Sequence, residues 1–197
     1  MSDFDSPFRR FCESVLYAVL RSVWGVKVTG LERVPRSGPL IVAFNHVSLV
    51  DGPLLCVAIA SSRRPCFLGK QELFRVPGLG WFLRTVGMIP LQRGTADHAA
   101  MRAALEILEG GGTIGLAPEG TRVKPGETRA PKPGVGFLAA KTGARVQPAR
   151  LVGAAEFPRR FPLEVRFGSP LPPPPADAGR EAASSYARAV MEAIYAL

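Results

Sequence analysis

The sequence predicts an α/β fold, a largely parallel mixed sheet flanked by helices, with an amphipathic helix at the N-terminus. Short apolar segments alternate along the chain with segments of helical periodicity, which is the pattern of parallel strands linked by crossover helices. The run Leu40–Phe44 is apolar at every position, as in a strand that is buried on both faces. A chain of 197 residues is long enough for one domain with a full core.

The composition is that of a globular protein that meets an anionic partner. Hydrophobic residues make up 47% of the chain and charged residues 21%, which excludes a disordered protein. The formal net charge of +9 favours contact with phospholipid, nucleic acid or an acidic carrier. Cys12, Cys56 and Cys66 have no metal-type spacing and stand among apolar residues, so we expect reduced core residues of an intracellular protein.

Residues 1–24 are the predicted amphipathic helix, and residues 25–197 the predicted α/β domain. Apolar residues recur at helical spacing on one side of this helix: Phe4, Phe8, Phe11, Cys12, Val15, Val19 and Val23. Charged residues fall on its other side: Arg9, Arg10, Glu13 and Arg21. Two roles are open for the apolar side. It either covers the core, or it dips into a bilayer while the arginines meet lipid phosphate.

The N-terminal segment lacks the features of a secretion signal and of a membrane span. Asp3 and Asp5 stand where a signal peptide is basic, and Glu13 interrupts the apolar run that follows. No window of the sequence holds the run of about 18 apolar residues that a spanning helix needs. We therefore expect contact with a membrane to be peripheral.

The remaining elements follow from periodicity and turn residues. We expect strands over residues 26–29, 40–44, 65–69, 86–91, 113–116, 146–152 and 163–167. We expect helices over residues 54–60, 95–108 and 134–140 and from about 179 onward, with a bent pair of short helices over 74–83. Residues 124–132 are polar and rich in turn formers, which favours a mobile loop over the site.

His46 stands where the strand Leu40–Phe44 ends, and Asp51 follows five residues later. The carboxyl ends of strands are where open α/β sheets place their sites. A neutral imidazole is a general base near neutral pH, and a carboxylate on its other nitrogen fixes its tautomer. Alternatively, His46 is an ordinary loop histidine and Asp51 an N-cap, because Pro53 indicates that a helix begins here.

Polar residues also follow three other predicted strands. Lys70 and Arg93 each end an apolar segment, and Glu119 and Arg122 follow the strand over residues 113–116. Gly120 between them permits a positive φ and a close backbone approach, and arginine offers a planar fork for phosphate or carboxylate. Each feature alone is typical of a solvated turn, but together they predict an anion-binding site at one sheet edge.

These residues resemble the motifs of the glycerolipid acyltransferases, typified by 1-acylglycerol-3-phosphate (lysophosphatidate) acyltransferase. The first motif, Asn-His-x-x-x-x-Asp, is met by Asn45, His46 and Asp51, and the third, Pro-Glu-Gly-Thr-Arg, by residues 118–122. Both are specific signals, and they occur in the family's order. The resemblance covers residues from about 26 to 167.

Two further motifs of the family are weaker signals in this chain. The second is met by Gly87 and Arg93, and the fourth by Val146 and Pro148. The departures from the family pattern are Ala117, Pro90 and Ala149, where Phe, an aromatic residue and Val are common. None of these departures removes a reacting group, but they leave the accepted lysolipid open.

The resemblance implies an enzyme of phospholipid biosynthesis with residues 25–197 as its acyltransferase domain. It would move a fatty acyl group from an acyl thioester, on coenzyme A or acyl carrier protein, to the free hydroxyl of a lysophospholipid. The expected acceptor is 1-acylglycerol-3-phosphate and the product phosphatidate. His46 would take the hydroxyl proton and Asp51 would hold the imidazole, without an acyl-enzyme. The substrate-binding residues would be Asn45, Lys70, Arg93, Glu119, Gly120, Thr121 and Arg122.

A metal site made of His46, Asp51 and Glu119 is an alternative, but the usual paired ligands are not evident in the sequence. We therefore expect no metal and no cofactor, with the acyl thioester as co-substrate. We expect an anionic membrane surface as partner, at the cytoplasmic face. One alternative is an acyltransferase for another lysolipid, such as lyso-ornithine lipid. The alternative from another class is a basic nucleic-acid-binding protein, which needs cations on one stripe with aromatic residues interleaved. The cations here are dispersed and phenylalanine concentrates in the first helix, so we expect no nucleic-acid partner.

Overall fold

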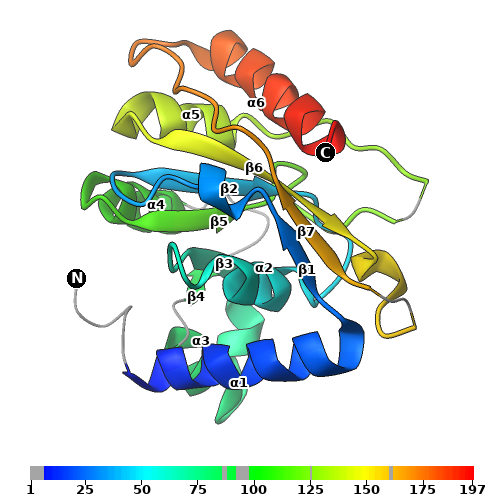
Figure 1. Ribbon diagram of the computed structural model, residues 1–197. Coiled ribbons are helices and arrows are strands. Elements are labelled where there is room, and N and C mark those ends of the chain that lie inside the picture. Colours follow the sequence, from blue (N-terminus) through cyan, green and yellow to red (C-terminus); the bar gives the residue numbers. More distant parts are fainter. Residues whose placement is uncertain (1–6, 86–87, 92–97, 125, 160–161) are drawn as a thin grey trace.

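The computed structural model describes residues 7–85, 88–91, 98–124, 126–159 and 162–197. Within them, helices cover both faces of one sheet (Figure 1). The strands are β1 (Lys27–Thr29), β2 (Leu40–Phe44), β3 (Cys66–Lys70), β4 (Met88–Leu91), β5 (Thr113–Leu116), β6 (Arg145–Val152) and β7 (Glu164–Phe167). The α-helices are α1 (Pro7–Trp24), α2 (Asp51–Ile59), α3 (Leu79–Thr85), α4 (His98–Glu109), α5 (Gly134–Thr142) and α6 (Arg180–Tyr195). Short 3₁₀ helices are η2 (Leu31–Arg33), η3 (Gln71–Arg75) and η4 (Ala154–Glu156).

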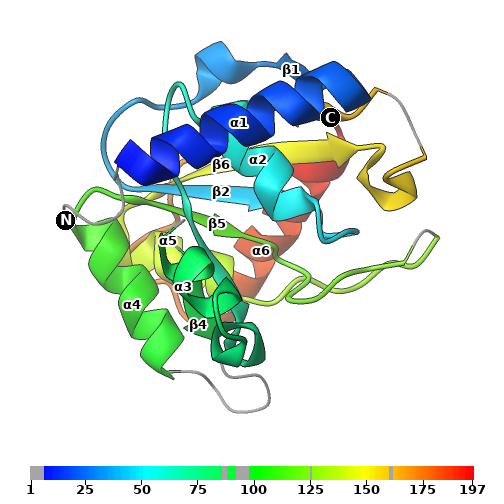
Figure 2. The same ribbon diagram turned by 90° about the horizontal axis from the view of Figure 1, so that it is seen from below.

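The sheet has the order β1-β7-β6-β2-β5-β3-β4. Neighbouring strands are parallel except for β6 and β7, which are antiparallel. This confirms the predicted largely parallel, mixed sheet. Because β2, β3, β4, β5 and β6 run in one direction, the loops that follow them meet at one edge. In Figure 2 the loops after β2 and β5 both lie at the right-hand edge of the view.

Strand β2 lies inside the sheet and is buried at every position. Its side chains alternate between two hydrophobic clusters. Leu40, Val42 and Phe44 pack with residues of α2 and with Leu20 of α1. Ile41 and Ala43 pack with α4, α5 and α6 on the other face. Figure 2 shows α1 and α2 in front of the sheet and α5 and α6 behind it. Packing on both faces fixes the end of β2, and with it the start of the next loop.

Most predicted elements are present with shifted ends. The expected pair of short helices over 74–83 is η3 followed by α3, and the strand expected over 86–91 is described from Met88. Residues 86–87 and 92–97 lie outside the described residues. The predicted start of the helix at Thr95 falls there, and so do the second-motif residues Gly87 and Arg93. The described residues between Thr121 and Pro133 form no regular helix or strand. The three cysteines are free.

Helix α1 turns its apolar side outward. Its large apolar side chains on that side are 42–65% exposed: Phe8, Phe11, Val15, Val19 and Val23. The residues that α1 buries are Arg9, Glu13 and Leu20. The interpretation in which this apolar side covers the core is therefore wrong, because α1 packs on the protein through another side, which carries Arg9, Glu13 and Leu20.

A hydrogen-bonded ion cluster accompanies the apolar contacts that Leu16 and Leu20 make beneath α1. Arg9 is fully buried, and its Nε donates to Glu13 Oε1 at 2.8 Å while its Nη2 donates to the carbonyl oxygen of Pro65 at 2.8 Å. Arg64 Nε donates to the other oxygen of Glu13 at 3.2 Å. A buried charge is tolerated when it is paired and hydrogen-bonded in this way. The cluster fixes which side of α1 faces the protein.

The expectation that the arginines of the first helix meet lipid phosphate stays a prediction for Arg10 and Arg21 only. Arg9 is wrong for that role because it is buried, whereas Arg10 and Arg21 are exposed. Among the described residues, no helix has both the length and the apolarity needed to cross a bilayer.

Candidate active site

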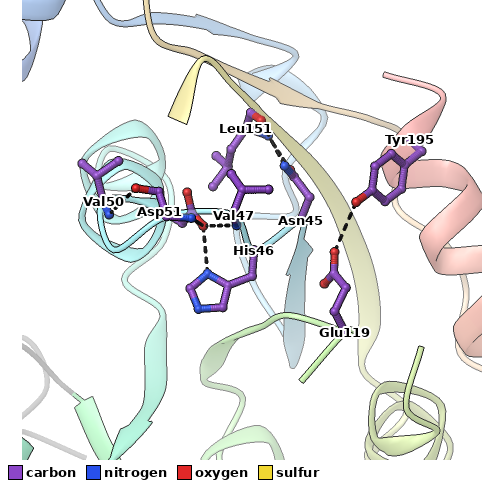
Figure 3. Close-up of polar contacts among 9 residues, drawn as sticks. Asn45, His46, Val47, Val50, Asp51, Glu119, Leu151 and Tyr195 are labelled. Atoms are coloured by element: carbon purple, nitrogen blue, oxygen red, sulfur yellow. Dashed lines mark hydrogen bonds and ion pairs between the residues drawn. The ribbon is translucent and has the colours of Figure 1, made fainter. Parts of the chain in front are cut away.

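His46 and Asp51 form a hydrogen-bonded pair where β2 ends. The imidazole Nδ1 lies 2.8 Å from Asp51 Oδ2, and the histidine side chain is 26% exposed while that of Asp51 is fully buried. The second ring nitrogen, Nε2, points away from the carboxylate (Figure 3). With Asp51 accepting the Nδ1 proton, Nε2 carries the free lone pair that a general base needs.

The carboxylate of Asp51 is held by the backbone of the loop between β2 and α2. Oδ2 accepts hydrogen bonds from the backbone N–H groups of Val47, at 2.7 Å, and Ser48, at 2.8 Å. Oδ1 is buried without a hydrogen-bond partner. These contacts leave Asp51 rigid and place its charge beside the imidazole.

The alternative prediction that Asp51 is an N-cap is wrong. Asp51 is the first residue of α2, the capping position is Val50, and no side chain caps the helix. The carboxylate turns back toward the preceding loop instead, because the two N–H groups and the imidazole there satisfy it. Pro53 does fall in the first turn of α2, as predicted.

The side chain of Asn45 ties the end of β2 to the backbone of β6. Its side-chain Nδ2 donates to the carbonyl oxygen of Leu151 at 3.1 Å, and its Oδ1 accepts from the backbone N–H of Leu151 at 2.7 Å. The amide is 3% exposed and continues the pairing of β2 with β6 by one more residue. This geometry supports a role in fixing the backbone beside His46, and gives no support to the substrate contact that the motif implied for Asn45.

The loop after β5 lies against the loop that carries His46. The backbone N–H of Val123 donates to the carbonyl oxygen of His46 at 2.8 Å. Glu119 in this loop is 1% exposed, its Oε1 accepts a hydrogen bond from Tyr195 Oη at 3.4 Å, and its Oε2 is buried without a partner. The structure thus brings Glu119 and His46 together, as predicted from their places after neighbouring strands (Figure 3).

Burial raises the pKa of the Glu119 carboxyl above its ordinary value. Nearby backbone N–H groups of Glu119 and His46, the charge of His46 and the Tyr195 hydroxyl lower this pKa in part, because each of them favours the ionised form.

Gly120 has the positive φ expected from the sequence, +67°. A Cβ at this position would lie 2.7 Å from Cε of Lys132, so the absence of a side chain lets Lys132 lie across the loop. The backbone of Lys132 is held by a 2.8 Å hydrogen bond to Pro118. Thr121 is half-buried and Arg122 is exposed, so both remain at the surface next to this loop.

Two predicted cations are only partly placed. Lys70 is the last residue of β3, which is parallel to β5, and the loop with Glu119 follows β5. The backbone of Lys70 therefore reaches the predicted sheet edge. Arg93 lies outside the described residues. The described residues contain no group of three or more His, Cys, Asp and Glu side chains arranged to hold a metal ion.

Sequence reasoning missed three residues next to the site. Lys132 was included in the predicted mobile loop, and Arg150 and Tyr195 were assigned only to a strand and a helix. Tyr195 contacts Glu119, and the Arg150 guanidinium lies 4.1 Å from the centre of the Tyr195 ring. No local sequence signal marks a contact across 76 positions, so only the packing of α6 reveals it.

Known proteins are similar to this chain over the region that contains the candidate active site. The family model described as "Acyltransferase" matches residues 25–152. The chain is 28% identical over 158 residues to the chloroplastic 1-acyl-sn-glycerol-3-phosphate acyltransferase LPAT1 of Arabidopsis thaliana, covering 76% of this chain and 44% of the relative. It is 32% identical over 156 residues to the 1-acyl-sn-glycerol-3-phosphate acyltransferase of Borreliella burgdorferi, covering 76% and 60%. The chain thus spans 44–60% of the length of these two relatives.

A solved structure has the same fold. The crystal structure of the 1-acyl-sn-glycerophosphate (LPA) acyltransferase PlsC from Thermotoga maritima matches with a TM-score of 0.70 and 27% identity, over 93% of this chain and 80% of that one. The family match spans more than half of the chain and contains His46, Asp51 and residues 118–122. Because this match coincides with the paired histidine and aspartate at the sheet edge, the chain belongs to the acyltransferase family.

Proposed function

We propose that this chain transfers a fatty acyl group from an acyl thioester to the free hydroxyl of a lysophospholipid, with 1-acylglycerol-3-phosphate as acceptor and phosphatidate as product. The observation that carries the proposal is the 2.8 Å hydrogen bond between His46 Nδ1 and a buried Asp51 carboxylate, in a chain of the acyltransferase family. The names of the relatives support the acceptor, since each of them acts on a 1-acylglycerol-3-phosphate.

In this proposal Nε2 of His46 takes the hydroxyl proton while the hydroxyl oxygen bonds to the thioester carbonyl carbon. The carbon–sulfur bond then breaks, and the imidazolium returns its proton to the leaving thiolate. Asp51 stabilises the imidazolium between these two transfers. The ester forms with no acyl-enzyme, and the balance of atoms needs no metal or cofactor because the acyl-CoA or acyl carrier protein thioester enters as a substrate.

We assign the acceptor phosphate to the cations beside Glu119. Arg122 and Lys132 belong to one loop, in which Lys132 lies against Gly120, and this loop contacts the His46 loop. Like charges gathered at a partly buried site repel one another unless an anion lies between them. Lys70 and Arg93 remain candidates for the same anion, because Lys70 ends β3 at this sheet edge and Arg93 comes two residues after the last residue of β4 in the sequence.

The phosphate assignment predicts a selective effect of Arg122→Ala. The Michaelis constant for a phosphate-bearing acceptor should rise at least about tenfold, because a charge-assisted contact contributes about 1.5–3 kcal/mol. The constant for the acyl donor should stay unchanged, and Arg122→Lys should recover only part of the loss, since lysine lacks the bidentate fork. Steady-state kinetics with acceptor and donor varied separately measure both constants.

The matched control is Arg129→Ala, because Arg129 is an exposed arginine on the same loop. It should leave the acceptor constant unchanged. An equal effect of both variants would show that the loop contributes only general positive charge, and no effect of Arg122→Ala would remove Arg122 from the phosphate pocket.

The activity itself is tested by an acyl-transfer assay in which a panel of lysolipids is crossed with acyl-CoA and acyl carrier protein donors. The panel includes lysophosphatidate, lysophospholipids with larger headgroups and a lyso-ornithine lipid, which carries no phosphate. We expect turnover to be highest with lysophosphatidate. A preference for the phosphate-free acceptor would retain the acyl transfer chemistry and overturn the acceptor.

We also propose that the protein binds an anionic membrane peripherally through α1. The exposed apolar side of α1 continues onto α3, because the Phe8 and Trp81 rings lie 5.4 Å apart and Trp81 is 62% exposed. Arg10 and Arg21 of the same helix are exposed, although on another side of it, and the net charge is +9. Such a surface fits the interfacial region of a bilayer, and the cytoplasmic leaflet supplies the anionic lipid.

A further inference from the structure

The end of α6 reaches the candidate active site. Tyr195 is the last residue of α6, and its hydroxyl donates to Glu119 Oε1 at 3.4 Å. Figure 3 shows its side chain extending from α6 toward Glu119, on the side of the carboxyl away from His46. Among the described residues, no other side chain has a hydrogen bond to this carboxyl. Besides the backbone N–H groups of Glu119 and His46, this phenol is therefore the contact that orients a buried carboxyl next to the general base.

The Tyr195 ring is itself held by a residue of the sheet, Arg150. The guanidinium of Arg150, on β6, lies 4.1 Å from the centre of the Tyr195 ring, which is well within the range of a cation–π contact. Arg150 Nη1 is buried and has no hydrogen-bond partner, so the contact that the structure gives this guanidinium is with the face of the Tyr195 ring. A cation over the ring withdraws electron density and makes the hydroxyl a better donor.

Packing alone does not account for this arrangement. Tyr195 is 47% exposed, so a leucine would fill its part of the interface without exposing a polar tip. The other tyrosine of α6 with a defined hydroxyl contact, Tyr186, donates at 2.8 Å to the carbonyl oxygen of Pro172, which is a tie between helix and loop. Tyr195 differs from it because its partner is an ionisable side chain at the candidate active site.

We propose that Tyr195, held by Arg150, is a positioning residue that fixes one oxygen of the Glu119 carboxylate and thereby orients the other in the acceptor pocket. This inference rests on the proposed function, in which Glu119 helps to shape that pocket. It makes the end of α6 part of the site, although α6 lies beyond the residues that the family model matches.

The proposal has a defined dependence on pH. The groups that face the Glu119 carboxyl are His46 at the end of β2 and Tyr195 of α6, with Arg150 acting through the ring and Lys132 on the adjoining loop. The Tyr195 hydrogen bond stabilises the ionised carboxylate and so lowers the Glu119 pKa. Without the hydroxyl this pKa rises, and the carboxyl stays protonated to higher pH.

The test compares Tyr195→Phe, which keeps the ring and removes the hydroxyl, with Tyr186→Phe as the matched control on the same helix. Tyr195→Phe should raise the acceptor Michaelis constant about three- to tenfold, because one hydrogen bond to a charged group is lost. The donor constant should stay the same, and the acid limb of kcat/KM for the acceptor should move to higher pH. Arg150→Gln should shift both quantities in the same direction by less, and Tyr186→Phe should shift neither.

A second measurement does not depend on the proposed activity. Carbon-13 NMR of the carboxyl groups, assigned with Glu119→Gln, follows the Glu119 titration in the substrate-free protein. The pKa should rise in Tyr195→Phe and stay unchanged in Tyr186→Phe. If wild-type protein transferred no acyl group but this pKa moved, the proposed function would fail while the positioning contact stood. An unchanged pKa and an unchanged acceptor constant in Tyr195→Phe would overturn the inference.

Discussion

His46→Ala should lower acyl transfer at least about a hundredfold, the loss expected when a general base is deleted. The imidazole supplies the only base that the proposed reaction uses, and alanine leaves the acceptor hydroxyl protonated when it meets the thioester. Stability should change little, because the histidine side chain is 26% exposed and Asp51 keeps two backbone hydrogen bonds. Single-turnover transfer and thermal unfolding of the purified variant measure the two effects.

Asp51→Asn should be nearly as damaging, because an amide no longer stabilises the imidazolium. His98→Ala supplies the control, since His98 is the second histidine of the sequence and starts a helix away from this loop. The mechanism is contradicted if folded His46→Ala protein keeps more than a tenth of wild-type turnover.

A triple variant of α1, with Phe11, Val15 and Val19 replaced by Ser, should lose membrane binding by about two to three orders of magnitude. Each buried apolar side chain of this kind contributes about 1.5–3 kcal/mol, and these three are only partly covered by protein. Because all three are at least 46% exposed, the fold should survive. Sedimentation with anionic vesicles measures the loss.

Phe137→Ser is the matched control for this variant, because Phe137 is a 41% exposed aromatic residue on α5, which covers the other face of the sheet. Wild-type binding should weaken with salt, since exposed charges are screened over about 10 Å at 0.1 M ionic strength. Equal vesicle binding by the triple variant and the wild type would return α1 to a structural role.

The fold was largely predictable because its strongest signals are local. A run such as Leu40–Phe44 and the helical stripes that follow it specify strands and helices without knowledge of their neighbours. The ends of these elements shifted by a few residues, since capping and packing decide them. The pairing of His46 with Asp51 was predictable for the same reason, as both belong to one short loop after one buried strand.

The sequence could not predict the direction in which a side chain or a helix face points, nor contacts between residues that are far apart in the chain. The aspartate was correctly paired but wrongly considered as a cap, because the turn of residues 46–48 decides which N–H groups its carboxylate meets. Tyr195 was missed because its contact with Glu119 crosses 76 positions, and Lys132 because only the folded shape of its loop brings it against Gly120. The orientation of α1 departs from the usual rule, since a satisfied ion cluster around Arg9 packs inward beside Leu20 while large apolar side chains of the helix face outward.

That inverted helix has a kinetic consequence. The charges of Arg9 and Glu13 are already withdrawn from water and paired inside the protein, while the apolar side of α1 is displayed before any lipid is met. In the membrane-bound state that we propose, docking would therefore require no rotation or refolding of the helix, because its apolar side is already exposed. We expect association with vesicles to be governed by diffusion and by the surface potential of the lipid rather than by a conformational step.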